Sequence, residues 1–175
     1  MSRSLRPAVF FDRDGVLNID NGFTHRPDDL RWNEGAVAAI KAVNDAGWYA
    51  FVVTNQAGVA HGHYTEKDVD DFHRQMDRVL AEHGAHIDEY VYCPFHPEAK
   101  LAAYRRHSPH RKPQPGMILD LVARWPVEIQ KSFLVGDRQS DLQAADSASI
   151  RAYLYEGGDL LLLVKQGLAA SGAAD

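Results

Sequence analysis

Short apolar segments alternate along the chain with stretches that have the spacing of amphipathic helices. Nearly continuous apolar runs predict buried strands at residues 8–11, 49–53, 87–92, 133–135 and 150–155. Residues 34–46, 65–83 and 115–124 and the segment between the last two strands have the character of helices. Buried strands separated by helices indicate a parallel sheet that is covered on both faces. We therefore predict an α/β fold, a Rossmann-like three-layer sandwich with a central, mostly parallel sheet, as a single domain over residues 1–175.

Local signals predict where the helices and loops lie. Thr65, with Asp68 three residues later, is expected to cap the long helix, and Gly84 is expected to end it. Residues 93–115 are rich in Pro, His and Arg and predict a long loop of the kind that is usually functional or mobile. The tail after Gly167 is rich in Ala, Gly and Ser and is expected to fray.

Composition limits the classes of function. The chain has 45% hydrophobic and 25% charged residues, which is ordinary for a soluble globular protein. Its formal net charge of -5 argues against a nucleic-acid partner, whose binding sites are usually basic. A single cysteine, Cys93, cannot form an internal disulfide, which favours a reducing compartment. No apolar run is long enough for a signal peptide or a membrane span, so we expect a cytoplasmic protein without a membrane partner, and a monomer.

Polar clusters follow three of the predicted strands. In a parallel sheet, ligands bind outside the carboxyl ends of the strands, so these clusters should meet at one edge. The clusters are Asp12-Arg13-Asp14-Gly15, Thr54-Asn55-Gln56 and Gly136-Asp137-Arg138 with Asp141, and the loop adds Arg111-Lys112-Pro113.

Each cluster has a simpler interpretation when it is taken alone. The Asp-Gly pair suits a solvated turn, Thr54 suits a helix cap, and Asp137 or Asp141 suits the capping of a helix N-terminus. The chemical interpretation rests on the carboxylates. Two aspartates two residues apart repel each other unless a cation or a proton neutralises one of them, and Mg²⁺ prefers such oxygen ligands.

The order of the clusters resembles that of the haloacid dehalogenase superfamily. The pattern D-x-D-G, then T-N, then a lysine, then G-D-x-x-x-D extends over nearly the whole chain. Residues 11–18, 53–60 and 111–117 resemble the D-glycero-D-manno-heptose 1,7-bisphosphate phosphatases, and the histidinol-phosphate phosphatases are a related family. These enzymes lack a large cap domain, and residues 15–34 and 54–92 leave no room for one here.

The resemblance implies a Mg²⁺-dependent phosphatase that forms an aspartyl-phosphate. Asp12 would be the nucleophile, and Asp14 would act as general acid and then as general base. Mg²⁺ would be held by Asp12, the backbone carbonyl of Asp14 and Asp137, with Asp141 orienting the metal ligands or Lys112. Lys112 and Thr54 would stabilise the transferring phosphoryl group.

The resemblance also implies a set of substrate-binding positions. Arg111 is expected to bind a second substrate phosphate, because a guanidinium can bind phosphate with two parallel hydrogen bonds. The full set is Asp20, Asn21, Gly22, Phe23, Asn55, Gln56, Arg111 and Arg138.

The loop departs from the family pattern. Many relatives hold a structural zinc with C-x-H and C-x-C, but the corresponding positions here are Cys93, Phe95, Ser108 and His110. A second set, Cys93, His96, His107 and His110, has spacings that zinc accepts. We favour histidines that decorate a solvent-facing loop held by the packing of Phe95, Leu101 and Tyr104, with no structural zinc.

The leading function is therefore phosphate removal from a small phosphorylated metabolite, most simply heptose 1,7-bisphosphate. Histidinol-phosphate phosphatase is the nearest alternative, although Arg111 and Arg138 favour an anionic ligand over a cationic amine. A nucleic-acid 3′-end phosphatase is a more distant alternative that the net acidity disfavours. A phosphate-binding module without catalysis is the alternative from another class.

Overall fold

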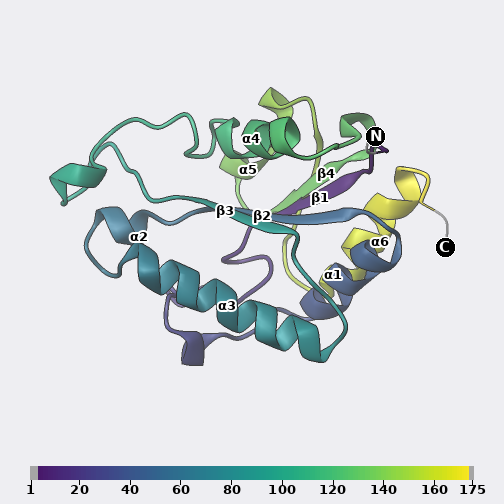
Figure 1. Ribbon diagram of the computed structural model, residues 1–175, viewed down its shortest axis with the longest axis horizontal. Coiled ribbons are helices and arrows are strands. Elements are labelled where there is room, and N and C mark those ends of the chain that lie inside the picture. Colours follow the sequence, from purple (N-terminus) through teal and green to yellow (C-terminus); the bar gives the residue numbers. More distant parts are fainter. Residues whose placement is uncertain (1–3, 174–175) are drawn as a thin grey trace.

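The computed structural model describes residues 4–173, which form a five-stranded sheet with helices on both faces (Figure 1). The strand order is β3-β2-β1-β4-β5, and all four pairings are parallel. This confirms the predicted α/β class. The strands are β1 (Ala8–Phe11), β2 (Tyr49–Asn55), β3 (Glu89–Cys93), β4 (Phe133–Gly136) and β5 (Arg151–Leu154).

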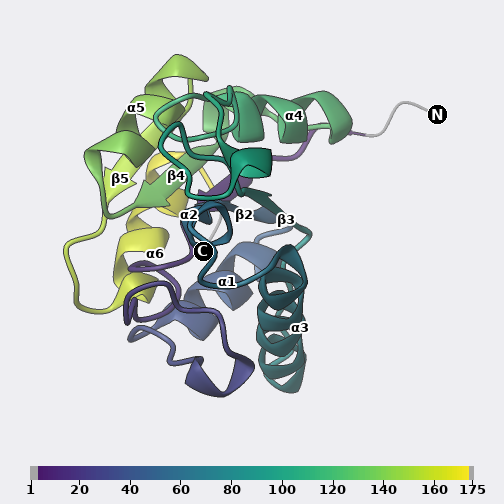
Figure 2. The same cartoon turned by 90° about the vertical axis from the view of Figure 1, so that its left-hand side faces the viewer.

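The helices form two layers around this sheet. In Figure 1, and again after the rotation of Figure 2, α4 and α5 lie on one side of the sheet and α1, α3 and α6 on the other. The helices are α1 (Ala36–Asp45), α2 (Ala57–Ala60), α3 (Glu66–Glu82), α4 (Gly116–Arg124), α5 (Gln139–Ser147) and α6 (Leu160–Ala170), and the 3₁₀ turns are η1 (Pro27–Asp29), η2 (Ala102–Tyr104) and η3 (Ile129–Lys131).

The alternation of side chains along the central strand β1 explains why helices cover both faces of the sheet. Successive residues of a strand point to opposite faces, so an apolar residue at every position needs a core on each side. Val9 and Phe11 lie in the core beneath α1, α3 and α6, whereas Ala8 and Phe10 lie in the core beneath α4 and α5. All four side chains are fully buried.

The strand order places a crevice where β1 lies between β2 and β4. The chain leaves β1 towards β2 and β3 and then returns to the other side of β1 to form β4, so the connections diverge at the carboxyl ends of β1 and β4. The two strands are joined there by the hydrogen bond from the Asp12 N–H to the Val135 carbonyl, at 3.0 Å. In Figure 2 the side of the molecule that carries α2 and the loops faces the viewer.

Most of the predicted boundaries agree with the structure. Thr65 caps α3 in a capping box with Asp68, and Gly84 follows the helix with a φ of 68°. The third strand begins at Glu89 rather than at residue 87, and the short helix α2 was not predicted. No large cap domain interrupts the described chain: residues 15–34 contain only the turn η1, and residues 54–92 contain α2 and α3.

The expected fraying after Gly167 is wrong for residues 168–170, which continue α6. Their small side chains suggested an unstructured tail, but the apolar positions Leu160, Val164 and Leu168 are spaced by four residues and pack against the sheet. The last part of that tail, residues 174–175, lies outside the described residues.

Within residues 4–173, no helix has both the length and the apolar content needed to cross a bilayer.

We expect Gly167 to be required for the close packing of α6 against the sheet. A Cβ added there would lie 2.6 Å from Cζ of the buried Phe133. Gly167→Ala should therefore lower the free energy of unfolding by about 1–3 kcal/mol, even though alanine is the better helix former. Denaturant unfolding of this variant, compared with Gln166→Ala on the exposed side of the same helix, measures the effect. A Gly167→Ala protein as stable as the parent would contradict the packing described here.

Candidate active site

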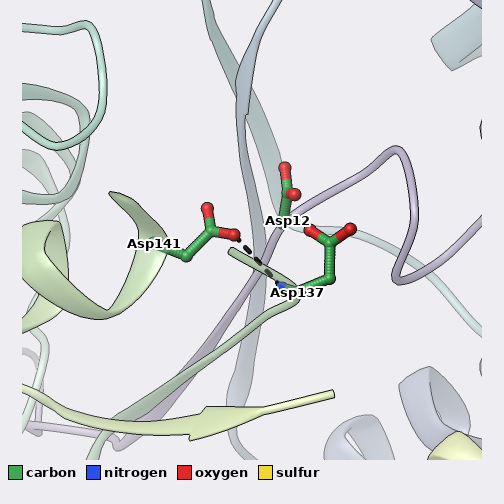
Figure 3. A group of neighbouring side chains, drawn as sticks. All are labelled: Asp12, Asp137 and Asp141. Atoms are coloured by element: carbon green, nitrogen blue, oxygen red, sulfur yellow. Dashed lines mark hydrogen bonds between the residues drawn. The ribbon is translucent and has the colours of Figure 1, made fainter. Parts of the chain in front are cut away.

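Three aspartates from two strand ends meet in the crevice (Figure 3). Asp12 follows β1, while Asp137 and Asp141 lie after β4 and in the first turn of α5. Each contributes a carboxylate oxygen, and these oxygens lie within 4.8 Å of one another. The expected metal positions Asp12 and Asp137 are thus brought together, and Asp141 joins them.

The local backbone fixes this arrangement. Asp141 Oδ2 accepts hydrogen bonds from the N–H groups of Asp137 and Arg138, at 3.2 and 3.1 Å, and so caps α5 while facing the other carboxylates. Two glycines leave the space that the aspartates occupy. A Cβ at Gly15 would lie 2.2 Å from Asp137 Oδ2, and a Cβ at Gly136 would lie 2.2 Å from Asp141 Cβ.

Lys112 is the buried cation of the site. Its Nζ lies 2.9 Å from Asp12 Oδ1 and 2.6 Å from Asp141 Oδ1, and it donates to the Val53 carbonyl at 2.8 Å. Burial opposes its charge, but the two carboxylates outweigh burial and raise the pKa of Lys112. The lysine is therefore a permanent positive charge at the nucleophile position.

The donor set fits a divalent cation. Burial raises the pKa of Asp12 to about 8, and Lys112 opposes this shift only in part. Asp137 Oδ1 is buried without a hydrogen-bond partner, and Asp141 Oδ1 has none beyond its ion pair with Lys112. When Asp12 is ionised, three carboxylates face one ammonium and two negative charges are unbalanced, and hard oxygen ligands of this kind suit Mg²⁺.

Asn55 holds the Lys112 segment in place. Its Nδ2 donates to the Lys112 carbonyl at 3.1 Å, and its Oδ1 accepts from the Lys112 N–H at 3.0 Å. The predicted role was a direct hydrogen bond to substrate. In the structure the Asn55 amide lines the cavity but is engaged with the backbone of the loop, which is how a residue on β2 positions a lysine 57 positions away.

Asp14 lies beside the nucleophile position and is held from two sides. Its carboxylate accepts from Arg13 Nε at 3.1 Å, from Asn18 Nδ2 at 2.9 Å and from Gln56 Nε2 at 3.0 Å. Its side chain is not part of the aspartate cluster, and the expected metal contact through its backbone carbonyl stays a prediction.

Arg13 is a site residue that the sequence analysis did not identify. It is only 1% exposed, and its guanidinium also contacts the Thr24 carbonyl at 2.8 Å and His73 Nε2 at 3.2 Å. Burial lowers the pKa of His73 well below its usual value, so the ring stays neutral and accepts the hydrogen bond from Arg13. An arginine between two aspartates was the available signal, but no pattern predicted its buried partner on α3.

Gln56 occupies a different place from the expected substrate-side position. Its side chain is 1% exposed and lies behind Thr54 and Asp14, where Nε2 donates to Thr54 Oγ1 at 2.9 Å and to Asp14 Oδ2 at 3.0 Å. Its Oε1 accepts from the hydroxyl of Tyr64, at 2.5 Å. Tyr64 itself was not predicted as a site residue.

The crevice opens into a cavity of about 540 Å³. Asp12, Thr54 and Lys112 line it, and so do six of the eight predicted substrate residues: Asp20, Gly22, Phe23, Asn55, Arg111 and Arg138. Besides Gln56, the exception is Asn21, which closes a turn in which its Oδ1 accepts from the Thr24 hydroxyl at 2.6 Å.

The two arginines of the cavity have different surroundings. Arg138 is exposed and lies 3.8 Å from Asp20 Oδ2. One terminal nitrogen of Arg111 is buried without a hydrogen-bond partner, and burial lowers the pKa of Arg111. A buried guanidinium nitrogen without an acceptor is costly, and an anionic ligand would remove that cost.

Three residues of the second zinc set, Cys93, His96 and His110, have separate surroundings. Cys93 is buried at the end of β3, the His96 ring lies 4.9 Å from that of His61, and His110 Nε2 lies 2.6 Å from Asp120 Oδ2. Among residues 4–173, the aspartate cluster is the one group of three or more His, Cys, Asp or Glu side chains with converging ligand atoms. The expected lack of a structural zinc stays a prediction.

Packing holds the loop partly as expected. Phe95 lies 6.0 Å from the Tyr104 ring and carries the Arg106 guanidinium at 4.2 Å, whereas the Leu101 side chain is largely exposed. A further clamp was not predicted: Glu66 of α3 accepts from the hydroxyls of Tyr92 and Tyr104, at 3.0 and 2.9 Å.

A parallel α/β sheet with a lysine and three aspartates at its central crevice defines the haloacid dehalogenase-like phosphatases. Residues 8–150 match the family model described as "Polynucleotide kinase 3 phosphatase". The solved structure of a Mesorhizobium loti protein assigned to the HAD-like phosphatases has a TM-score of 0.89 at 26% identity, covering 99% of this chain and 90% of that one.

Relatives with higher sequence identity define the family more specifically. The D-glycero-beta-D-manno-heptose-1,7-bisphosphate 7-phosphatase of Rhodopseudomonas palustris is 48% identical over 161 residues, 92% of this chain and 89% of that protein. The D,D-heptose 1,7-bisphosphate phosphatase of B. bronchiseptica, solved with magnesium and phosphate, has a TM-score of 0.76 at 32% identity and covers 97% of this chain and 89% of its own. The chain belongs to the heptose-bisphosphate phosphatase family and is a phosphatase.

Replacing Asp12 by asparagine should abolish turnover without unfolding the protein. Phosphate release should fall by roughly 10³-fold or more, because an amide is a poor nucleophile. In metal-free buffer the variant should melt no lower than the parent, because burial disfavours the charged form of Asp12 and asparagine is a neutral group of nearly the same shape. Phosphate release and thermal melting in EDTA measure the two effects, and residual turnover near the parent level would exclude Asp12 as the nucleophile.

The hydrogen bonds from Tyr92 and Tyr104 to Glu66 should keep the loop of residues 93–115 ordered. Glu66→Ala removes the acceptor of two tyrosine hydroxyls and should cost about 1 kcal/mol of stability. Amide hydrogen exchange should rise within residues 93–115 and stay unchanged in β1 and β4. Glu82→Ala, at the exposed far end of α3, is the control. Unchanged exchange in the loop would show that Glu66 does not hold it.

Proposed function

We propose that this protein hydrolyses one phosphate ester of D-glycero-β-D-manno-heptose 1,7-bisphosphate, with the 7-phosphate as the group that leaves. The observation that carries the proposal is the pairing of a reacting centre in the depth of the cavity with the unpartnered Arg111 nitrogen along its wall. A ligand with two phosphates can use both. The name of the Rhodopseudomonas palustris relative supports the sugar, its β anomer and the 7-position.

In the first step, a carboxylate oxygen of Asp12 attacks phosphorus and the bond from phosphorus to the sugar oxygen breaks. Asp14 gives its proton to the leaving oxygen, so the products are an aspartyl-phosphate and a neutral alcohol. Lys112 and the Thr54 hydroxyl stabilise the charge on the phosphoryl oxygens. Asp12, the Asp14 carbonyl and Asp137 would hold Mg²⁺, which would supply positive charge that lets an anionic nucleophile approach an anionic phosphate.

In the second step, a water molecule attacks phosphorus and the acyl phosphate bond to Asp12 breaks. Asp14, now ionised, takes a proton from that water, and inorganic phosphate leaves. Lys112 enters the reaction charged, because Asp12 and Asp141 raise its pKa, and in this step the Asp141 carboxylate and the phosphoryl oxygens face its ammonium group. Asp141 contributes by holding Lys112 and by accepting a hydrogen bond from the Asp137 N–H at the start of α5.

Residues at the rim of the cavity determine which substrates are preferred. Arg111 and Arg138 favour an anionic distal group, which a sugar bisphosphate has and histidinol phosphate lacks. Asp20, Gly22 and Phe23 lie where sugar hydroxyls would be bound. We further propose a single phosphatase domain that acts as a cytoplasmic monomer without nucleic acid and without structural zinc, which its acidic net charge and single cysteine support.

The substrate proposal is tested by magnesium-dependent phosphate release across a panel. The panel holds both anomers of heptose 1,7-bisphosphate, histidinol phosphate, a 3′-phosphorylated oligonucleotide and an aryl phosphate. We expect the β-heptose bisphosphate to have the highest kcat/KM. A preference for histidinol phosphate or for the oligonucleotide would overturn the substrate while leaving the phosphatase chemistry in place.

Arg111 should carry the preference for a second phosphate. Arg111→Gln should lower the ratio of kcat/KM for the bisphosphate to that for the aryl phosphate by roughly 10- to 100-fold, which corresponds to one charge-assisted contact. Arg78→Gln on the exposed face of α3 removes the same charge far from the cavity and should leave the ratio unchanged. An unchanged ratio in Arg111→Gln would exclude this role.

A further inference from the structure

A chain of hydrogen bonds extends from a buried tyrosine to the phosphate-facing threonine. The Tyr64 hydroxyl donates to Gln56 Oε1, at 2.5 Å, and Gln56 Nε2 donates to Thr54 Oγ1 at 2.9 Å. The exposed fractions are 7% for Tyr64 and 1% each for Gln56 and Thr54. The sequence analysis placed Gln56 on the substrate side, so this chain has no role in the reaction described above.

The orientation of the Gln56 amide is fixed from both ends. Burial raises the pKa of Tyr64 to about 12, so its hydroxyl keeps its proton and donates to Oε1. At the other end lies Asp14 Oδ2, 3.0 Å from Nε2, and a carboxylate that is paired with Arg13 accepts hydrogen bonds. Both amide protons are therefore used, one towards Asp14 and one towards Thr54.

This orientation determines where the threonine proton points. A hydroxyl group has one proton to donate, and Thr54 Oγ1 here receives a hydrogen bond from Gln56. Among the described residues, no side-chain or backbone oxygen accepts from Thr54 Oγ1, and Thr54 lines the cavity beside Asp12 and Lys112. The Thr54 proton is thus left for a ligand in the cavity.

We infer that Tyr64 and Gln56 are positioning residues that aim the Thr54 hydroxyl at the transferring phosphoryl group. Tyr64 also lines the cavity, but its hydroxyl is used on Gln56, and both residues act by fixing the direction in which Thr54 donates. Pre-oriented donors of this kind stabilise charge in the transition state without the cost of reorientation during the reaction.

The surroundings of Tyr64 support a precise placement. A Cβ at Gly58 of α2 would lie 2.0 Å from Cε1 of Tyr64, so the ring packs directly on the backbone of that helix. On the opposite side, the His25 ring stacks on Tyr64 with 4.7 Å between centroids. The Tyr64 ring therefore packs against both His25, in the loop after β1, and Gly58 of α2, the helix after β2.

The inference rests on the proposed phosphoryl transfer but not on the identity of the sugar. It is tested with a double-mutant cycle on the full chain, with Mg²⁺ and an aryl phosphate as the probe. Tyr64→Phe keeps the ring and removes only the hydroxyl. We expect it to lower kcat about tenfold with KM within twofold, because the contact it orients strengthens in the transition state.

The Thr54→Val background separates positioning from simple stabilisation. Thr54→Val should itself lower kcat by roughly 10²-fold, and Tyr64→Phe should then change kcat by less than about twofold. In the Thr54→Ser background, which keeps a hydroxyl, the effect of Tyr64→Phe should return. Tyr155→Phe is the matched control. The Tyr155 hydroxyl donates to the Gly158 carbonyl at 2.7 Å and is not part of the hydrogen-bond chain from Tyr64 to Thr54, so this variant should leave kcat unchanged.

An equal loss on Tyr64→Phe in the parent and the Thr54→Val backgrounds would overturn the inference, as would an unchanged kcat in Tyr64→Phe. If Tyr64→Phe fails to fold by thermal melting, Gln56→Met enters the same cycle with the same expected outcomes. A parent protein that hydrolyses the aryl phosphate but not heptose bisphosphate would refute the substrate proposal and leave this test intact.

Discussion

The structure depends on the placement of Lys112 between Asp12 and Asp141. Three carboxylates in a crevice with little water repel one another, and burial adds to the cost of their charge. The ammonium group offsets part of that cost, and a divalent cation would balance the rest. The fold is stable with this cluster because Lys112 is brought from a distant loop and held there by Asn55 and the Val53 carbonyl.

This constraint explains why so much of the molecule serves to position a few groups. Gly15 and Gly136 leave room for Asp137 and Asp141, and the long loop is tied to α3 by Glu66 at the level of Tyr92 and Tyr104. A loop that carries both the buried cation and Arg111 must stay close to the sheet, since a shift of about 1 Å at the reacting atoms costs a large part of the rate.

The sequence predicted the features that follow from local pattern. Apolar runs located all five strands, and the rule that ligands bind at the carboxyl ends of strands brought Asp12, Thr54 and Asp137 to one edge. What it missed depends on contacts between distant segments. Arg13 meets His73 across 60 residues, Gln56 meets Tyr64 behind the site, and α6 continues because its apolar spacing outweighs its small residues.

The same contrast separates the two kinds of polar residue at the site. Those that line the cavity, such as Asp12, Lys112 and Arg111, carry the charges, and one nitrogen of Arg111 has no protein partner. Others, such as Asn55 at the cavity wall and Gln56 behind it, use their amide groups on protein atoms. A motif marks both kinds equally, because it records residue types and not directions. The direction of each amide is set by groups such as the Tyr64 hydroxyl, which lies outside the motif, and this is why we infer a positioning role for Gln56 from its hydrogen bonds.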